Sequence, residues 1–458
     1  MFRRDPSAEA YLIVHDATPS YVFATRATVP LEATFDGGLL TSDGGLPWLV
    51  EADRQLGICS AFAACLKDWR KDPSRIRHTR ENLVRQRVFQ MACGYEDQDD
   101  ADTLRTDPLF KLACGQLPLS GEDLASHPTL SRLENAVDRH TCQRLALALV
   151  ETYLTRRSKN GIPQRILLDC DSTDDPTHGD QEGSAYHGYY RQHMYHPLLI
   201  FDGDTGQLIT AILRPGDAHA SRLIIRILKI LLRYLRARWP KVTIELRADS
   251  GFASPKLYTF CEQEQIDYTI GLASNARLEP LAKDLLAQAV AERKQTGAQK
   301  VRLVGEGTYQ AKSWDKERRV VYKAEALAKG PNVRFVVTTS KAAPLAVYDH
   351  YVDRGEPEQW IDQLKATCFA DRLSCCDFWP NQFRLLLAAA VYWLLDTIRS
   401  WLQKAKVPPM RMETLRLTVL KIGGRVFELT SRIRLRLASS HPGQSLWHLL
   451  APYRGSGE

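Results

Sequence analysis

The sequence has ten cysteines but lacks any C-x-x-C pair, the spacing that many structural zinc sites use. Cys375 and Cys376 are adjacent, which suits neither a zinc knuckle nor an ordinary disulfide. We therefore expect all ten cysteines to be reduced structural residues, as is usual in proteins of the cytoplasm.

Long apolar runs are also missing. The most apolar stretch has 11 residues, from Leu385 to Leu395, whereas a helix needs about 20 to cross a membrane. We expect a buried helix there and no membrane association. The opening residues, MFRRDPSAEAYLIV, contain no long apolar run either, so we expect no signal peptide.

Several motifs that would define other enzyme classes are absent. No G-x-x-x-x-G-K-[ST] loop occurs, so the two Asp-Gly-Gly sequences between Phe35 and Leu46 are better explained as tight turns than as a phosphate site. No G-x-S-x-G nucleophile elbow occurs. A group of histidines lacks the spacing of a standard zinc site, and we expect loop hydrogen bonds or DNA contacts from them. These are His178, His187, His193 and His196.

What is present is a 458-residue chain with a net charge of +7, long enough for two to four domains. Residues 366–458 hold 13 Lys/Arg against 6 Asp/Glu, a surplus of 7 that equals the whole-chain excess. Such a basic region is either a soluble surface or one that faces a polyanion. The segment from Arg70 to Arg87, which includes Arg75, Arg77 and Arg80, is either a solvated helix face or a contact surface for DNA phosphates.

The pattern along the chain predicts an α/β protein. The first 160 residues or so are mainly helical in pattern, and from Arg165 the order is strand, strand, strand, helix, strand, helix, strand. A polar helix and short strands follow, then two more helices and a basic region of mixed pattern. We place domain boundaries at these changes, which gives the segments 1–160, 161–273, 274–345, 346–405 and 406–458.

Three carboxylates stand out against this pattern. In RILLDCDST, strand alternation places Asp169 and Asp171 on one face. Two acids on an apolar strand are costly to bury unless a cation meets them, and a metal ion is one such cation. Asp249, in LRADSGF, ends a later strand, where ligand sites of α/β sheets are often found. Taken alone, Asp249 is also explained as a turn or cap residue.

The third carboxylate is in YVDRGEPEQWIDQLK, residues 351–365. This stretch predicts a helix that begins near Pro357, because proline suits the first position of a helix. Glu358 and Lys365 are two turns apart and share a face. By itself this is an ordinary amphipathic helix with a solvated charged side. An acid on a first strand, an acid after a fourth and an acid on a late helix together form the layout of the ribonuclease-H-like fold. Such a trio can bind two divalent cations, and hard oxygens select Mg²⁺, with Mn²⁺ as a substitute.

These residues resemble one large group of bacterial insertion-sequence transposases, the DDE type. Tyr351, Arg354, Glu358 and Lys365 match the Y-x₂-R-x₃-E-x₆-K signature of that group, gap for gap. Asp171-Ser172-Thr173 resembles its first acid, and Asp249 in ADSGF resembles its second. The stretches FDGGLLTSDGGL, HGDQEGSAYHGY and FWPNQFRLLL also look like one branch of the group, so the resemblance covers most of the chain.

The resemblance implies a fold and an activity. The fold is a ribonuclease-H-like catalytic core, a mixed five-stranded sheet with helices, that a β-rich insertion at 274–345 interrupts. A mainly helical N-terminal domain at 1–160 would bind DNA ends. The activity is Mg²⁺-dependent cleavage and strand transfer at the inverted-repeat ends of an insertion sequence. Asp171, Asp249 and Glu358 would be the catalytic metal ligands; Asp169 stays an alternative to Asp171, although the D-x-T spacing of the family favours Asp171.

The resemblance also implies DNA contacts and partners. Tyr351, Arg354 and Lys365 would hold the DNA backbone, with arginine suited to bidentate phosphate contact. In cut-and-paste members the insertion helps to hold the cleaved end as a hairpin, and a tryptophan there can stack on a flipped base. Trp314 is the only tryptophan of the insertion, and a place in a small core explains it equally well. The implied partners are double-stranded DNA with terminal inverted repeats, target DNA and a second copy of the chain. The implied location is the bacterial cytoplasm, on the nucleoid when bound.

Two other functions stay open from the sequence. One is a stand-alone nuclease of the same fold, and the other is a domesticated DNA-binding protein that has lost catalysis. The acid trio disfavours the second, and the insertion with its DNA-gripping residues disfavours the first. Short inverted repeats on both sides of the gene, bracketed by a direct target duplication, would distinguish a transposase from both.

Overall fold

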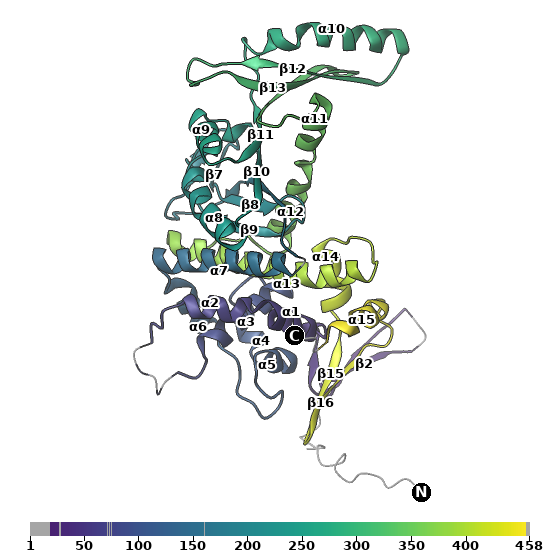
Figure 1. The fold of residues 1–458 in the computed structure, drawn as a ribbon. Helices are drawn as coiled ribbons and strands as arrows, with labels where there is room; N and C mark the ends of the chain where they lie inside the picture. Colours follow the sequence, from purple (N-terminus) through teal and green to yellow (C-terminus); the bar gives the residue numbers. More distant parts are fainter. Residues whose placement is uncertain are drawn as a thin grey trace.

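A computed structural model describes residues 19–26, 29–70, 72, 74, 76–159 and 161–454. Figure 1 shows a layered molecule, with a β-rich layer at the top, a sheet with flanking helices below it, a helical layer further down and a β hairpin at the bottom right. The expectation of no signal peptide concerns residues 1–18, which lie outside the described residues.

Eight strands form the central mixed sheet, in the order β12-β13-β14-β11-β10-β4-β8-β9. β4 is parallel to β10, and β10 is parallel to β11. β8 is antiparallel to β4 and forms a hairpin with β9. The predicted succession of strands and helices after Arg165 is confirmed by this middle part of the sheet. The strands are β4 (Arg165–Ser172), β8 (Leu198–Asp202), β9 (Leu208–Ile212), β10 (Thr243–Ala248), β11 (Asp267–Leu272), β12 (Lys300–Tyr309), β13 (Arg318–Leu327) and β14 (Gly330–Thr338).

β4 lies in the interior of this sheet. It has a hydrogen-bonded neighbour on each edge, and its residues from Ile166 to Asp171 are all buried. Strands that are covered on both faces are typically continuous apolar runs, and the run RILLDCDS departs from that rule only at its two aspartates. Both aspartates therefore need a compensating cation.

The β-rich insertion that was expected to interrupt the five-stranded core is joined to the core sheet. Its strands form an antiparallel meander, and β14 pairs with β11 from Thr269–Thr338 to Leu272–Phe335. The inserted strands thus extend the same sheet, because the free edge of β11 offers unpaired backbone groups that β14 satisfies. The predicted polar helix is α10 (Glu279–Thr296), which packs on β12 and β13 at the top of Figure 1.

Helices connect and flank the strands. α8 links β9 to β10, and α9 links β10 to β11, beginning after Ser254 with Pro255 in its first turn as predicted. The helix predicted to begin near Pro357 begins two residues earlier, at Gly355, with Arg354 at its N-cap. These helices are α7 (Arg139–Ser158), α8 (Ile224–Arg238), α9 (Pro255–Gln263), α11 (Pro344–Val352), α12 (Gly355–Ala366) and α13 (Phe378–Lys404).

The two ends of the chain contribute to the same core. One cluster of buried apolar side chains extends from Leu46 to Leu450, and the short strand β3 pairs with β15. Gly45, in one of the predicted turns, lies at this junction, where a Cβ would overlap the Val419 carbonyl. The elements are α1 (Leu46–Leu56), α2 (Ile58–Cys65), α3 (Arg80–Ala92), α4 (Asp100–Leu104), α5 (Pro108–Ala113), α6 (His127–Asn135), α14 (Met412–Leu415), α15 (Gln444–Leu450), β3 (Leu40–Thr41), β15 (Gly424–Leu429) and β16 (Arg432–Leu437).

α13 contains the most apolar stretch of the sequence. Among the described residues it is the one helix long and apolar enough to cross a membrane, with a mean hydropathy of 1.4 over its best window. However, 89% of that window is buried inside the protein, against α1, α3, α7 and β9 among others. This matches the predicted buried helix.

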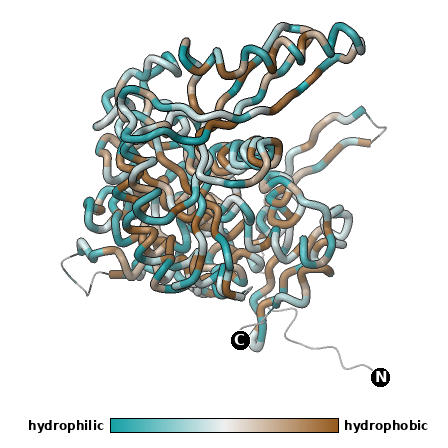
Figure 2. Tube along the Cα trace, turned by 45° about the horizontal axis from the view of Figure 1, so that its top comes forward, coloured by the Kyte–Doolittle hydropathy of each residue, from teal (hydrophilic) through white to brown (hydrophobic). Residues whose placement is uncertain are grey.

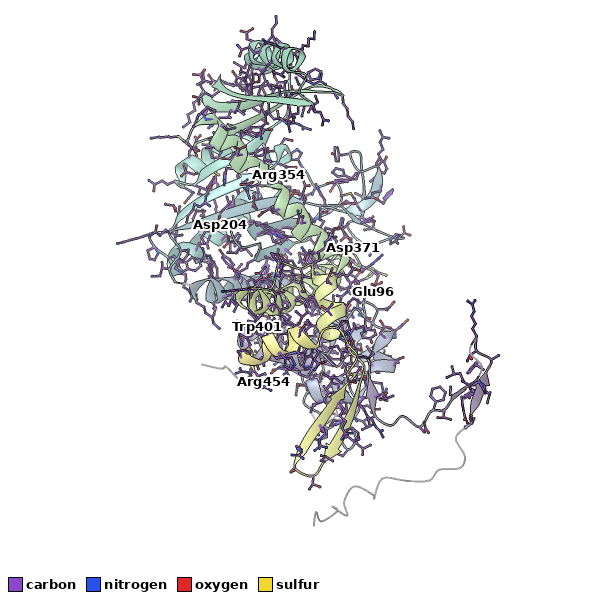
Figure 3. All side chains as sticks on the ribbon, turned by 90° about the vertical axis from the view of Figure 1, so that its right-hand side faces the viewer. Glu96, Asp204, Arg354, Asp371, Trp401 and Arg454 are labelled. Carbon is purple, nitrogen blue, oxygen red and sulfur yellow. The ribbon has the colours of Figure 1, made fainter. Side chains whose placement is uncertain are left out.

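Two small β structures lie outside the central sheet. β1 (Tyr21–Phe23) and β2 (Leu31–Ala33) pair into an exposed ribbon that projects from the body in Figures 2 and 3. Directly after β4, the histidine-rich segment forms a three-stranded sheet of order β5-β7-β6. Its strands are β5 (Asp175–Pro176), β6 (Ala185–His187) and β7 (Gln192–Tyr195).

Candidate active site

Asp171 and Asp249 lie at the carboxyl ends of two neighbouring strands. β4 and β10 are parallel, and their last residue pair, Cys170 with Ala248, brings the next residue of each strand to the same level. Asp171 is buried, with 8% of its surface exposed. Asp249 accepts a hydrogen bond from the Gly251 amide at 2.9 Å and so caps a short 3₁₀ helix.

Arg354 joins this pair to the third predicted acid. Its Nη1 donates to Asp171 Oδ2 at 2.9 Å, and its Nη2 lies 3.6 Å from Glu358 Oε1. The arginine side chain is 19% exposed, whereas that of Glu358 is 68% exposed. Figure 3 shows Arg354 where α11 meets α12, beside the sheet. The guanidinium is thus the cation that compensates the buried charge of Asp171.

The carboxylates influence one another. Burial raises the pKa of Asp171 to about 6; Arg354 opposes this rise, and Asp249 and Glu358 add to it. For Arg354, burial lowers the pKa, but Asp171 and the neighbouring acids raise it by more. The three predicted acids therefore converge electrostatically on one guanidinium.

Asp169 is committed elsewhere. Arg247 of β10 donates to it twice, from Nε to Oδ1 at 2.6 Å and from Nη2 to Oδ2 at 2.5 Å, and both side chains are at most 2% exposed. Arg247 also donates to the His350 carbonyl of α11 at 2.6 Å. Both carboxylate oxygens of Asp169 are therefore engaged by Arg247, whereas Asp171 accepts only one bond from an arginine.

Tyr351 lies in α11, against the sheet. Its hydroxyl occupies the space that a Cβ at Gly271 of β11 would need, so the close approach requires glycine there. Burial raises the pKa of Tyr351, and Arg354 opposes this by charge and by a side-chain hydrogen bond. Tyr351 and Arg354 are therefore neighbours at the acid cluster.

Lys365 bonds to a residue that the sequence analysis did not single out. Its Nζ donates to Asp174 Oδ1 at 2.9 Å and to the Asp174 carbonyl at 2.8 Å. Burial raises the pKa of Asp174, but the Lys365 ammonium lowers it by more, so the net shift is downward. Asp174 also accepts from Gln192 Nε2 of β7 at 2.9 Å. Lys365 thus ties α12 to the segment that follows Asp171.

The chemistry of these donors fits a hard divalent cation, since the acids offer only carboxylate oxygens. Burial, together with the nearby charges of Asp249 and Glu358, raises the pKa of Asp171, and a divalent cation would favour its ionised form. Even so, no group of three His, Cys, Asp or Glu within the described ranges is arranged to hold a metal ion. The Glu358 side chain is largely exposed, and its carboxylate lies 3.6 Å from the Arg354 guanidinium.

Trp314 does not present a free ring. It is 7% exposed and packs edge-on against Tyr258 and Tyr309, at ring-centroid distances of 5.2 and 5.3 Å, with the Arg318 guanidinium 5.5 Å away. Of the two interpretations of Trp314, the geometry supports the place in a small core rather than stacking on a flipped base.

Trp314→Ala is expected to destabilise the protein by about 3–5 kcal/mol, as large-to-small core substitutions do, while Trp314→Phe loses much less. Urea or thermal unfolding measures this effect. Leu345→Ala, on the exposed side of α11, is the matched control and should change little. An unchanged unfolding midpoint in Trp314→Ala, combined with weaker binding of an unpaired base, would restore the stacking interpretation.

The arginines of the Arg70–Arg87 segment differ in exposure and in whether they bond to other parts of the protein. Arg77 is exposed, Arg80 donates to the Leu66 carbonyl, and Arg87 forms a fully buried ion pair with Glu134. Arg87 is therefore neither part of a solvated helix face nor open to DNA, the two alternatives that the sequence left for this segment. Arg75 lies outside the described residues. A cavity of about 600 Å³ opens here, lined by Trp69, Arg70, Arg77, His78, Arg105, Glu122, Asp123, Leu124, Ser126, Thr129 and Arg132.

Three site residues were missed by sequence reasoning: Arg247, Gly271 and Asp174. The role of Arg247 could have been predicted from the sequence, because Arg247 stands two residues before Asp249 and strand alternation puts both side chains on one face. Two buried acids on β4 each need a cation to compensate their charge, and Arg247 on the adjacent strand is near enough to be one of these cations. The contacts of Gly271 and Asp174 depend on α11 and α12, whose position on the sheet the sequence does not reveal.

Comparison with family models decides the classification. The model described as "Transposase DDE domain group 1" matches residues 23–453, nearly the whole chain. The chain belongs to this family. It is a DNA transposase, and the family match spans every residue of the acid cluster. No curated protein matches the transposase sequence.

Among solved structures, the transposase is similar to the piggyBac transposase, seen by cryo-electron microscopy in a synaptic complex with hairpin DNA. The sequence identity is 12%, the match covers 83% of this chain and 80% of that chain, and the TM-score is 0.40. This similarity is too low to relate individual residues of the two proteins.

Proposed function

We propose that this transposase cuts and joins DNA at the terminal inverted repeats of an insertion sequence, using Asp171, Asp249 and Glu358 as ligands of Mg²⁺ or Mn²⁺. The observation that carries the proposal is the convergence of these three carboxylates on Arg354 at the carboxyl edge of β4 and β10. A divalent cation there would stabilise charge on the phosphoryl oxygens and favour ionisation of a water or 3′-hydroxyl.

The residues of the chain divide the remaining work. The Asp171 carboxylate is held by bonds from Arg354 and the Ser172 amide, and that of Asp249 by a bond from the Gly251 amide, so both offer oxygens in set positions. Glu358 is the mobile member, since its side chain is 68% exposed and its ion pair is long. Arg354 neutralises the cluster. A phosphate of the bound strand would bind the side of the guanidinium that does not contact Asp171, with Tyr351 and Lys365 beside it.

The proposed fold of the catalytic core is ribonuclease-H-like. Support comes from the strand order β9-β8-β4-β10-β11, with the first acid on the central strand and the second directly after its parallel neighbour. The proposed partners are duplex DNA with inverted repeats, target DNA and a second copy of the chain. The exposed arginines of β16, Arg432, Arg434 and Arg436, alternate with inward apolar residues and offer one basic face to that DNA.

The test is a cleavage assay with the element's own ends. The DNA on both sides of the gene gives the inverted repeats, and a duplex that carries one repeat and its flank is the substrate. We expect a nick at the repeat boundary with Mg²⁺ and none with EDTA, and joining of the freed end to a second DNA. A nuclease would cut the same substrate without preference for the boundary and without joining, and that result would contradict the proposal.

Lys365→Ala and Arg354→Ala are expected to slow joining by about 10- to 100-fold, since a hydrogen bond to a charged group contributes roughly 1.5–3 kcal/mol. Raising the concentration of Mg²⁺ or Mn²⁺ should not restore the rate, whereas it should partly restore Glu358→Asp. The measurement is cleavage and joining of a pre-nicked end across a metal titration. Lys404→Ala, an exposed lysine at the end of α13, is the control. Full rescue of Lys365→Ala by metal would assign the lysine to the metal site instead.

A further inference from the structure

The hairpin of β6 and β7 presents aromatic rings to solvent. Tyr189 is 85% exposed and Tyr186 is 57% exposed, although tyrosine rings usually bury much of their area in a core or an interface. They lie in the stretch AYHGYYRQHMYH, residues 185–196, which holds four tyrosines and three histidines. Tyr195 and His196 of this stretch are buried, at 0% and 4% exposed, so the core explains those two rings but not the exposed rings of Tyr186 and Tyr189.

The rings form an ordered array rather than a loose cluster. Tyr189 meets Tyr190 edge-on at a centroid distance of 5.0 Å, and Tyr190 in turn meets His187 at 5.1 Å. On the other side of the hairpin, Tyr186 meets His193 at 5.8 Å. Tyr189 thus rests on the half-buried Tyr190, whereas Tyr186 contacts His193, which is itself exposed.

The array stands beside the acid cluster. Burial raises the pKa of Tyr190 to about 12, and Asp174, Asp171 and Asp249 all add to that rise, so the ring lies within electrostatic reach of all three. The hairpin is also anchored there, because Gln192 donates to Asp174, the residue that Lys365 holds. The hairpin and the acid cluster are thus connected through Asp174.

The charge of the hairpin suits a polyanion. Residues 185–196 include Arg191 and no Asp or Glu. Arg191 is exposed and has a left-handed backbone (φ 56°), with its amide bonded to the His187 carbonyl at 2.7 Å, so the turn itself presents the cation next to Tyr189 and Tyr190. Aromatic faces with an adjacent cation are the usual means of binding unpaired nucleotides.

We propose that the β6–β7 hairpin is a base-stacking platform for unpaired nucleotides at the DNA end, with Tyr189 and Tyr186 as the stacking residues and Arg191 as the phosphate contact. This deepens the proposed function and rests on it, because it specifies how the end is held once its strands separate. The platform takes the place that the sequence analysis offered to Trp314, whose ring is buried.

The test uses a repeat-end duplex with a short single-stranded overhang that contains 2-aminopurine, bound by the full-length protein in EDTA. Stacking on a tyrosine quenches this base. We expect Tyr189→Ala to abolish the quench and weaken binding of the overhang substrate roughly 5- to 150-fold, the range for one stacked base. Binding of the blunt duplex should not change. Tyr189→Phe keeps the ring and should behave like the parent, and Tyr21→Ala, an exposed tyrosine of the β1–β2 ribbon, is the matched control.

The outcomes separate this inference from the proposed function. Retained quench and affinity in the double variant Tyr186→Ala, Tyr189→Ala would overturn the platform, as would an equal loss on blunt and overhang DNA. Metal-dependent cleavage by the parent protein in the same preparation tests the function independently. A parent that quenches the base but never cleaves would support the platform and refute the transposition chemistry at this site.

Discussion

Asp171→Ala, Asp249→Ala and Glu358→Ala are each expected to abolish strand cleavage while DNA-end binding is retained. A metal ion at a phosphoryl centre contributes several kcal/mol, so loss of a ligand should lower the rate by about a thousandfold or more. Binding should survive, because removal of Asp171 frees Arg354, which then has a positive charge available for phosphate. The measurements are nicking of the repeat-end duplex and a binding titration on the same protein.

The control for this result is Asp204→Ala, an acid in the turn between β8 and β9 that pairs with Arg165. It should cleave like the parent protein. Mg²⁺-dependent cleavage that persists in Asp171→Ala would move the first ligand to Asp169, against the geometry of the Arg247 pair. Cleavage that persists in Glu358→Ala would end the three-acid mechanism.

The second large effect concerns stability. Asp169→Ala and Arg247→Ala should each destabilise the protein by about 3–5 kcal/mol, because either change leaves an uncompensated charge in a site that is at most 2% exposed. The double variant should lose less than the sum of the two, since neither charge then stays unpaired. Urea unfolding measures the three variants against Arg165→Ala, whose partly exposed ion pairs should contribute about 0–1 kcal/mol.

Additive losses in the double variant would contradict a direct charge pair. If Asp169→Ala is still active but unfolds at a lower urea concentration than the parent protein, the two neighbouring aspartates have different roles. Asp169 would then hold the sheet together, and Asp171 would serve the chemistry.

The sequence predicts the local parts of this molecule well. Alternation in RILLDCDST and the proline of SPKLYTF place strand β4 and helix α9 correctly, because strand faces and helix starts depend on nearby residues. What it does not predict depends on contacts between distant segments. The pairing of β14 with β11 joins strands that 57 residues separate (Leu272 to Gly330, excluding both), and no local pattern specifies which edge an inserted strand will choose.

The site divides in the same way. The acids stand where the residue types and strand ends suggest, and the placement of Asp171 and Asp249 follows from two parallel strands. The burial of Trp314 and of Arg87 depends on Tyr258 and Glu134, which come from other elements. The sequence does not distinguish an arginine or tryptophan that faces DNA from one that packs on a buried partner, so composition alone does not show which role the residue has.

The continuous sheet gives the insertion a mechanical property. A domain attached by two flexible linkers can swing, whereas β12 and β13 are each ten residues long and cantilevered from β11 through β14. At about 3.3 Å per residue, each strand is a stiff arm of roughly 33 Å. Its root reaches Gly271, against which the Tyr351 hydroxyl rests. A load on the tip of that arm would therefore act through β14 and β11 on the contact between Gly271 and Tyr351, next to Arg354.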